Sequence, residues 1–103
     1  MNIAIAANID NVNSFFDEHF GRCNWFCLYN SETGKTTFIA NPAKDLMQKA
    51  GCQAAEYLIS QHINVIVAGR FGSKVVDLFR KNNVQVVIPE SQRTLQDIIN
   101  QIK

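Results

Sequence analysis

The sequence predicts one α/β domain in three layers, built on a mixed five-stranded sheet with one antiparallel strand. The second half of the chain alternates short apolar runs with amphipathic helical patterns, which indicates parallel strands joined by right-handed helical crossovers. The first half contains two apolar segments separated by a polar turn, which predicts a β-hairpin and therefore one strand of opposite direction. Segments that are apolar on both faces indicate that other layers cover both faces of the sheet.

Length and composition agree with a single domain and exclude several classes of protein. The chain has 103 residues, of which 47% are hydrophobic and 18% charged, and this composition is too apolar for a disordered chain. Ten basic and nine acidic residues give a formal net charge of +1, so bulk electrostatics predicts neither nucleic-acid nor membrane-surface binding. No apolar run approaches the roughly 20 residues of a membrane span, and no signal peptide is evident, so we expect a cytoplasmic protein. The three cysteines are expected as thiols or thiolates, because an odd number in such a protein does not suit a disulfide framework.

The first half of the chain predicts a buried strand, a long loop and the hairpin. Residues 2–7 are apolar and predict a buried strand, whereas residues 8–22 form a connection about three times the usual length, and such loops are often functional. Residues 23–29 and 36–40 predict the two hairpin strands on either side of the turn at residues 30–35. Four apolar side chains are expected to tether the long loop to the core: Val12, Phe15, Phe16 and Phe20.

The second half predicts three helices and two further strands. Asn41-Pro42 ends the hairpin, and small or apolar residues at three- and four-residue spacing then predict a helix over residues 51–62. Apolar strands are expected at residues 63–68 and 84–88, with a helix between them that Gly72 or Ser73 caps and Asn82-Asn83 ends. A last helix is expected over residues 94–102, capped by Thr94 or Ser91.

These elements would bring several loops to one edge of the sheet. We expect the strand order of a ribonuclease-H-like motif, and in such sheets ligands bind beyond the carboxyl ends of the parallel strands. The loop at residues 8–22, the helix start near Gly51 and the turns at residues 69–73 and 89–91 should all lie there. Because the strand at residues 23–29 is antiparallel, Cys23 should begin at this edge and share a face with Cys27. Cys27 should lie roughly 13 Å inside the sheet, at about 3.3 Å per residue, and belong to the core.

The same edge collects candidate ligands for a metal centre. His19, Cys23 and Cys52 combine an imidazole with two thiols, which suits a transition metal or a metal–sulfur cluster. Arg22, Arg70 and the helix amino terminus after Gly72 could hold the negative charge of such a cluster. A closed structural zinc site is disfavoured, because no pair of cysteines has the two-residue spacing typical of such sites.

His19-Phe20-Gly21-Arg22, preceded by an apolar strand, resembles the dinitrogenase iron–molybdenum cofactor biosynthesis family. The similarity continues through Thr33-Gly34, Asn41-Pro42 and the run Val65-Ile66-Val67-Ala68-Gly69-Arg70-Phe71-Gly72, and it covers nearly all 103 residues. It implies a ribonuclease-H-like fold and one cofactor-binding domain over residues 1–103.

The resemblance also implies what that domain does. It implies a carrier or scaffold for an iron–sulfur or molybdenum-containing cofactor, not an enzyme, with cofactor donor and acceptor proteins or a second copy of the chain as partners. His19 would hold the cofactor, and Gly21, Gly69 and Gly72 would be loop-shaping positions. Cys23 and Cys52 as ligands rest on the edge argument alone.

Two other classes of function stay open at this point. Asp10, Asp17 and Glu18 could bind a divalent metal for phosphodiester hydrolysis, although such carboxylates usually come from several elements and these three lie in one loop. Alternatively, the chain could be a module without metal, either a thiol redox sensor that uses Cys23 or an oligomeric adaptor.

Overall fold

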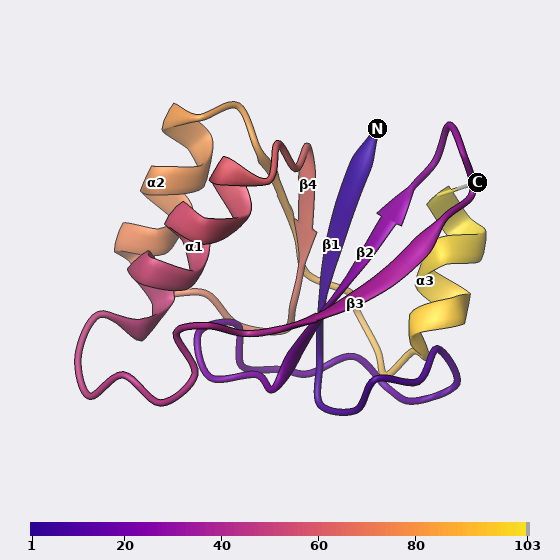
Figure 1. Cartoon of the computed structure of the whole chain (residues 1–103), viewed down its shortest axis with the longest axis horizontal. Coiled ribbons are helices and arrows are strands. Elements are labelled where there is room, and N and C mark those ends of the chain that lie inside the picture. Colours follow the sequence, from indigo (N-terminus) through magenta and orange to yellow (C-terminus); the bar gives the residue numbers. More distant parts are fainter. Residues whose placement is uncertain (103) are drawn as a thin grey trace.

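The computed structural model describes residues 1–102 and contains five strands and three helices (Figure 1). In chain order these elements are β1 (Asn2–Ala7), β2 (Trp25–Asn30), β3 (Thr36–Ala40), α1 (Ala50–Ser60), β4 (Val65–Val67), α2 (Ser73–Lys81), β5 (Gln85–Val87) and α3 (Leu95–Ile102). Among these described residues, no helix has the length and apolar character needed to cross a membrane.

The five strands form one mixed sheet in the order β3-β2-β1-β4-β5. β1 pairs antiparallel with β2 and parallel with β4, and the pairing continues antiparallel from β2 to β3 and parallel from β4 to β5. β2 therefore runs against the other four strands. This arrangement is that of a ribonuclease-H-like motif and confirms the predicted fold class.

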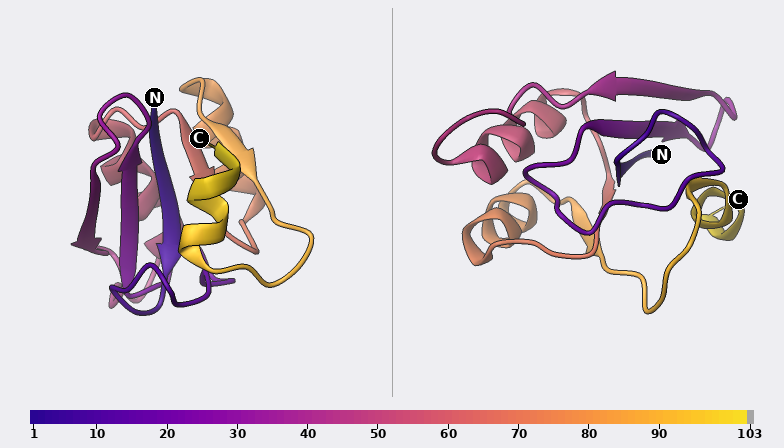
Figure 2. Two further views of the ribbon diagram at one scale, coloured as in Figure 1. Left: turned by 90° about the vertical axis from the view of Figure 1, so that its right-hand side faces the viewer. Right: turned by 90° about the horizontal axis from the view of Figure 1, so that it is seen from below.

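Helices cover both faces of the sheet, and each face has its own core. Figures 1 and 2 show α1 and α2 together on one face and α3 on the other. Along β1, Ala4 and Ala6 face α1 and α2, whereas Ile3 and Ile5 face α3, and all four side chains are fully buried. A strand buried on both faces has to be apolar at every position, which explains the unbroken run that predicted it.

β2 begins two residues later than predicted, and this changes the environment of Cys23. The side-chain amide of the buried Asn41 donates hydrogen bonds to the carbonyls of Gly21 and Cys23, at 3.1 and 3.0 Å. These bonds hold the backbone where the turn at residues 20–22 ends. Cys23 packs in the core under α1 and α2 beside Phe26 and does not share the face of Cys27. Cys27 itself is fully buried, as predicted.

Other element ends also differ from the expected positions. Phe16 and Phe20 are buried and Val12 packs against the core, as predicted, but Phe15 is 58% exposed. Residues 42–45 form a turn and residues 47 and 48 a bend, and α1 starts at Ala50 after Lys49, whose φ of 59° is left-handed. The shortest strands, β4 and β5, each keep three residues.

The amino terminus of α3 is capped as the sequence suggested. The Asp97 N–H donates to Thr94 Oγ1 at 3.1 Å, and the Thr94 N–H donates to Asp97 Oδ2 at 3.3 Å. This reciprocal pair satisfies two backbone donors that a helix start leaves open. It fixes where the segment that follows β5 turns into α3.

Candidate functional site

The long loop at residues 8–24 crosses the edge of the sheet at which β1, β4 and β5 end. Figure 2, seen from below, shows the loop reaching from the side of α3 to the side of α1 and α2. Phe16 enters the core under α3, and Phe20 enters the opposite core, where its ring lies 5.3 Å from that of Phe71 between centroids. Phe16 also donates its backbone N–H to the Arg93 carbonyl at 3.1 Å, and the Leu95 N–H donates to the Ser14 carbonyl at 2.9 Å. The loop is therefore held by both layers and by the segment before α3.

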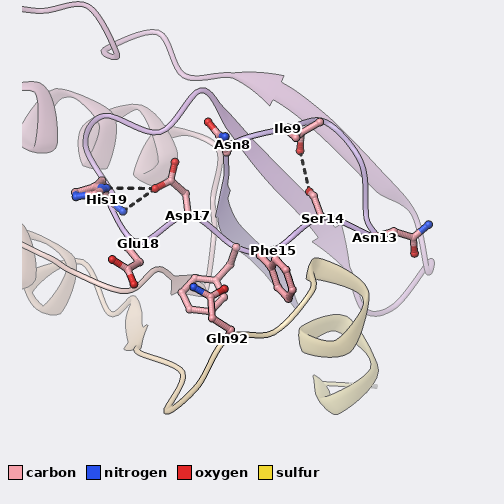
Figure 3. Close-up of a pocket in the computed structure, with 10 residues that line it drawn as sticks. Asn8, Ile9, Asn13, Ser14, Phe15, Asp17, Glu18, His19 and Gln92 are labelled. Atoms are coloured by element: carbon pink, nitrogen blue, oxygen red, sulfur yellow. Dashed lines mark hydrogen bonds and ion pairs between the residues drawn. The ribbon is translucent and has the colours of Figure 1, made fainter.

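The loop and this segment enclose an open cleft of about 780 Å³ (Figure 3). Its floor and walls mix apolar side chains, amides and the charged end of the loop. The lining residues are Asn8, Ile9, Asn13, Ser14, Phe15, Phe16, Asp17, Glu18, His19 and Gln92. Ile9 and Phe15 are both more than half exposed, so the cleft offers apolar surface beside polar groups.

His19 lies at one end of this cleft with most of its ring in solvent. Its side chain is 64% exposed, and its Nδ1 atom lies 3.5 Å from Asp17 Oδ1. The same carboxylate oxygen accepts the backbone N–H of His19 at 2.9 Å. On its other side, His19 forms a parallel bridge with Arg70, and the Arg70 N–H donates to the Glu18 carbonyl at 2.7 Å. His19 therefore stands where the loop that lines the cleft meets the turn at residues 69–72.

Two glycines allow the close packing that places this loop. A Cβ on Gly21 would lie 2.8 Å from the Cα of Gly51, and a Cβ on Gly69 would lie 2.9 Å from the Cα of Glu18. Real Cβ atoms essentially never approach other atoms so closely. The loop-shaping role implied for Gly21 and Gly69 thus has a steric basis, whereas a Cβ on Gly72 would meet open space. Gly72 instead stands at the amino terminus of α2 as its N-cap residue.

The two predicted arginines have different surroundings. The Arg22 guanidinium donates to the backbone carbonyls of Lys44, at 3.1 Å, and of Leu46. These contacts attach the exposed Arg22 side chain to the segment before α1, and the predicted role of Arg22 in holding the charge of a cofactor stays a prediction. Arg70 is exposed beside His19.

The predicted ligand set of His19, Cys23 and Cys52 is not brought together. Cys23 is fully buried, and its thiol lies 3.2 Å from the Phe20 carbonyl. Burial, with a smaller contribution from the Asp17 charge, raises the pKa of Cys23 to about 12. Cys52 is half-buried on α1 and packs against the core beneath that helix. Within residues 1–102, no three histidine, cysteine or acidic side chains are grouped so that they could hold a metal ion.

These positions also bear on the alternative functions. A reactive thiol needs a lowered pKa and access to solvent, and Cys23 has neither, so it does not suit a redox sensor. Of the acidic residues considered for a hydrolytic metal site, Asp17 faces His19 and Asp10 is exposed in the same loop. The carboxylates thus give no preformed metal site within the described part of the chain.

Some residues that shape the site were not found from the sequence. The sequence predicts Asn41 only as the end of a strand, yet its buried side chain donates hydrogen bonds to the backbone of the loop. Its position directly before a proline was the available signal, because such a residue is restricted to extended conformations and frees its side chain for local bonds. Gln92 reaches the cleft from a segment more than seventy residues away along the chain, and no local pattern marks it.

The chain is similar to a known protein family, to a curated protein and to solved structures. A family model described as dinitrogenase iron-molybdenum cofactor matches residues 1–103. An uncharacterized protein of Methanocaldococcus jannaschii is 29% identical over 85 residues, which cover 80% of this chain and 70% of that protein. The apo form of the orange protein from Desulfovibrio gigas has a TM-score of 0.90 at 22% identity, covering 98% of this chain and 85% of that chain. A protein from Thermotoga that belongs to the DUF35 family has a TM-score of 0.82 at 21% identity, with coverage of 98% and 85%. At these identities, the two structures share the fold.

Proposed function

The chain belongs to the dinitrogenase iron-molybdenum cofactor family, and on this premise we propose that it binds and carries a preassembled metal–sulfur cluster. The cluster, iron–sulfur or molybdenum-containing, is the cargo, and the protein would receive it from a donor protein and deliver it to an acceptor during cofactor biosynthesis. The observation that carries the proposal is the exposed imidazole of His19 at the junction of the cleft and the turn at residues 69–72.

The donor set favours a preassembled cluster over a bare metal ion. Imidazole is a good ligand for iron and other transition metals. A single exposed imidazole supplies one ligand atom, whereas a protein site for a bare ion usually supplies three or four. A cluster that already carries its sulfides needs only one further ligand from the protein at an open position.

The charges near His19 suit an anionic cargo on the side of the turn. Arg70 is exposed next to His19, and the amino terminus of α2 follows within three residues. The first turn of this helix contains no acidic residue, and its end carries a partial positive charge with free N–H groups. The carboxylates of Asp17 and Glu18 lie on the cleft side. We therefore place the charged part of the cargo above His19, toward Arg70 and Gly72, with the apolar surface of Phe15 beneath its other side.

The test is anaerobic loading with iron and sulfide, with and without molybdate, and separately with a preassembled cluster. Visible absorption and metal analysis would compare the wild type with His19→Asn. We expect His19→Asn to weaken cluster uptake about tenfold or more, which corresponds to the loss of about 1.4 kcal/mol of binding free energy. The control is His62→Asn, because His62 is the other histidine of the chain and is exposed. Asparagine also tolerates the left-handed backbone of His62, whose φ is 61°.

The same loading experiment tests the contribution of the positively charged residues near His19. Arg70→Gln should weaken uptake of an anionic cluster severalfold, whereas Arg80→Gln, on the exposed side of α2, should leave it unchanged. Full uptake by His19→Asn, or no uptake of any cluster by the folded wild type, would overturn the proposed function.

A further inference from the structure

We infer that Asp17 is the positioning residue that presents the Nε2 atom of His19 to the cargo. This inference rests on the proposed function for its purpose, but its physical basis is the geometry of one carboxylate oxygen. Asp17 Oδ1 accepts the backbone N–H of His19 at 2.9 Å and lies 3.5 Å from the Nδ1 atom of the same residue (Figure 3). One oxygen atom therefore binds the backbone of His19 and lies beside Nδ1 of its ring.

Asp17 is suited to this role because it is held much more firmly than the residue it orients. Its side chain is 17% exposed, against 64% for His19. Its backbone N–H donates to the carbonyl of Ala6 at 2.8 Å, which attaches it directly to the end of β1. The preceding residue, Phe16, is buried in the core under α3. The carboxylate is thus part of the rigid sheet edge, and the imidazole projects from it.

The chemistry of imidazole then determines which nitrogen faces the cargo. A neutral imidazole has one protonated nitrogen and one with a free lone pair, and the neighbours decide which is which. A carboxylate beside Nδ1 stabilises the proton on Nδ1, so the lone pair resides on Nε2. Histidines that bind metals commonly have their second nitrogen oriented by a carboxylate in this way.

Glu18 provides the matched control for this assignment. It is the next residue, it lines the same cleft and it carries the same charge. Figure 3 shows its carboxylate directed away from the imidazole, whereas Asp17 points toward it. Asp17→Asn and Glu18→Gln therefore remove the same charge from the same cleft, but only the first removes the carboxylate that faces Nδ1.

The experiment is long-range ¹H–¹⁵N NMR of the metal-free protein at mildly alkaline pH, where imidazoles are neutral. The tautomer of His19 is read from its two ring nitrogens, with His62 as the internal reference. In the wild type and in Glu18→Gln we expect the proton of His19 on Nδ1. In Asp17→Asn, and more completely in Asp17→Ala, we expect the population to move toward the Nε2–H form, with the backbone spectrum reporting that each variant is folded.

The outcome separates this inference from the proposed function. A wild-type His19 with its proton on Nε2, or a tautomer that Asp17→Asn and Asp17→Ala leave unchanged, overturns the inference whatever the protein binds. Because no metal is present, failure of cluster loading does not affect the tautomer measurement. With the preassembled cluster as probe, we expect Asp17→Asn to weaken uptake about tenfold and Glu18→Gln less than about twofold. Equal effects of the two variants on uptake would overturn the positioning role.

Discussion

Cys27 shows how burial determines the chemistry of a single residue in this fold. Its side chain is fully buried on β2, and burial raises the pKa of the thiol from 9.0 to about 12. The folded protein therefore keeps the proton at a pH at which the unfolded chain loses it. Consequently, the protonated Cys27 thiol makes its full contribution to the free energy of unfolding below pH 9.0. This contribution is lost as the pH rises from 9.0 toward 12.

This direction of pH dependence can be tested with Cys27→Ala, which has no titratable group at this position. Between pH of about 8 and about 10, the free energy of unfolding of the wild type should fall by about 1.4 kcal/mol more than that of Cys27→Ala. Urea unfolding at the two pH values gives this difference, and the contributions of all other groups cancel. Cys52→Ala, at the half-buried thiol, provides the control. Identical pH dependence in the wild type and Cys27→Ala would contradict the prediction.

At the level of residues, the sequence was most informative where one motif carries several constraints. The string from His19 to Arg22 predicted a histidine at the sheet edge, and in the structure the backbone of His19 pairs there with that of Arg70. The burial of Cys23 was not predictable in the same way. It depends on a hydrogen bond from Asn41, which follows the end of β3. The partner of His19 is only two positions away, but sequence spacing cannot show which way two loop side chains point.

At the level of elements, the glycine contacts determine how the loop lies against its neighbours. Gly21→Ala would press a methyl group into the backbone at the start of α1, and Gly69→Ala would press one into the backbone of Glu18. Neither neighbour is the mobile end of a flexible side chain, so the backbone has to shift. We expect each substitution to destabilise the protein by about 1–3 kcal/mol.

Gly72→Ala is the matched control, since its Cβ would meet nothing within 4 Å and its φ of −69° suits any residue. Its free energy of unfolding should change by less than about 1 kcal/mol. Thermal or urea unfolding of the three variants tests the ranking. Gly21→Ala or Gly69→Ala with wild-type stability would show that the loop can move away from the packed position.

The eight elements of the described residues were predicted from apolar runs, helical spacing and the hairpin turn, but several of their ends were not. Buried strands and helix faces leave a repeating pattern because each turn or residue pair meets the same core. The residue at which a strand or helix begins depends on single local features. Examples are the hydrogen bonds of Asn41 just before β2 and the left-handed backbone of Lys49 before α1. The cleft was even harder to predict from the sequence, because Gln92 and Phe15 both line it only as a result of the tertiary fold.

At the level of the whole molecule, the site exists because the two layers hold one loop from opposite sides. Phe16 belongs to the core under α3, and Phe20 belongs to the core under α1 and α2. Asp17 and His19 lie between these two anchors in the chain, so the carboxylate and the imidazole are placed by both cores together. The sheet edge supplies the third constraint through the hydrogen bond from Asp17 to Ala6.

Two anchors in separate cores should contribute independently to stability. We expect Phe16→Leu and Phe20→Leu each to lower the free energy of unfolding by about 1–2 kcal/mol, because each leaves part of a tightly packed space unfilled. Phe15→Leu, at the 58% exposed ring that directly precedes Phe16 in the same loop, should change it by less than about 0.5 kcal/mol. In the double variant, the effects of Phe16→Leu and Phe20→Leu should add within about 0.5 kcal/mol, since the sheet separates the two rings. Urea unfolding of the four variants measures this coupling. A coupling well above about 1 kcal/mol would mean that the loop behaves as one unit that leaves both cores together, in which case His19 would be placed by a cooperative closure of the edge and not by two independent supports.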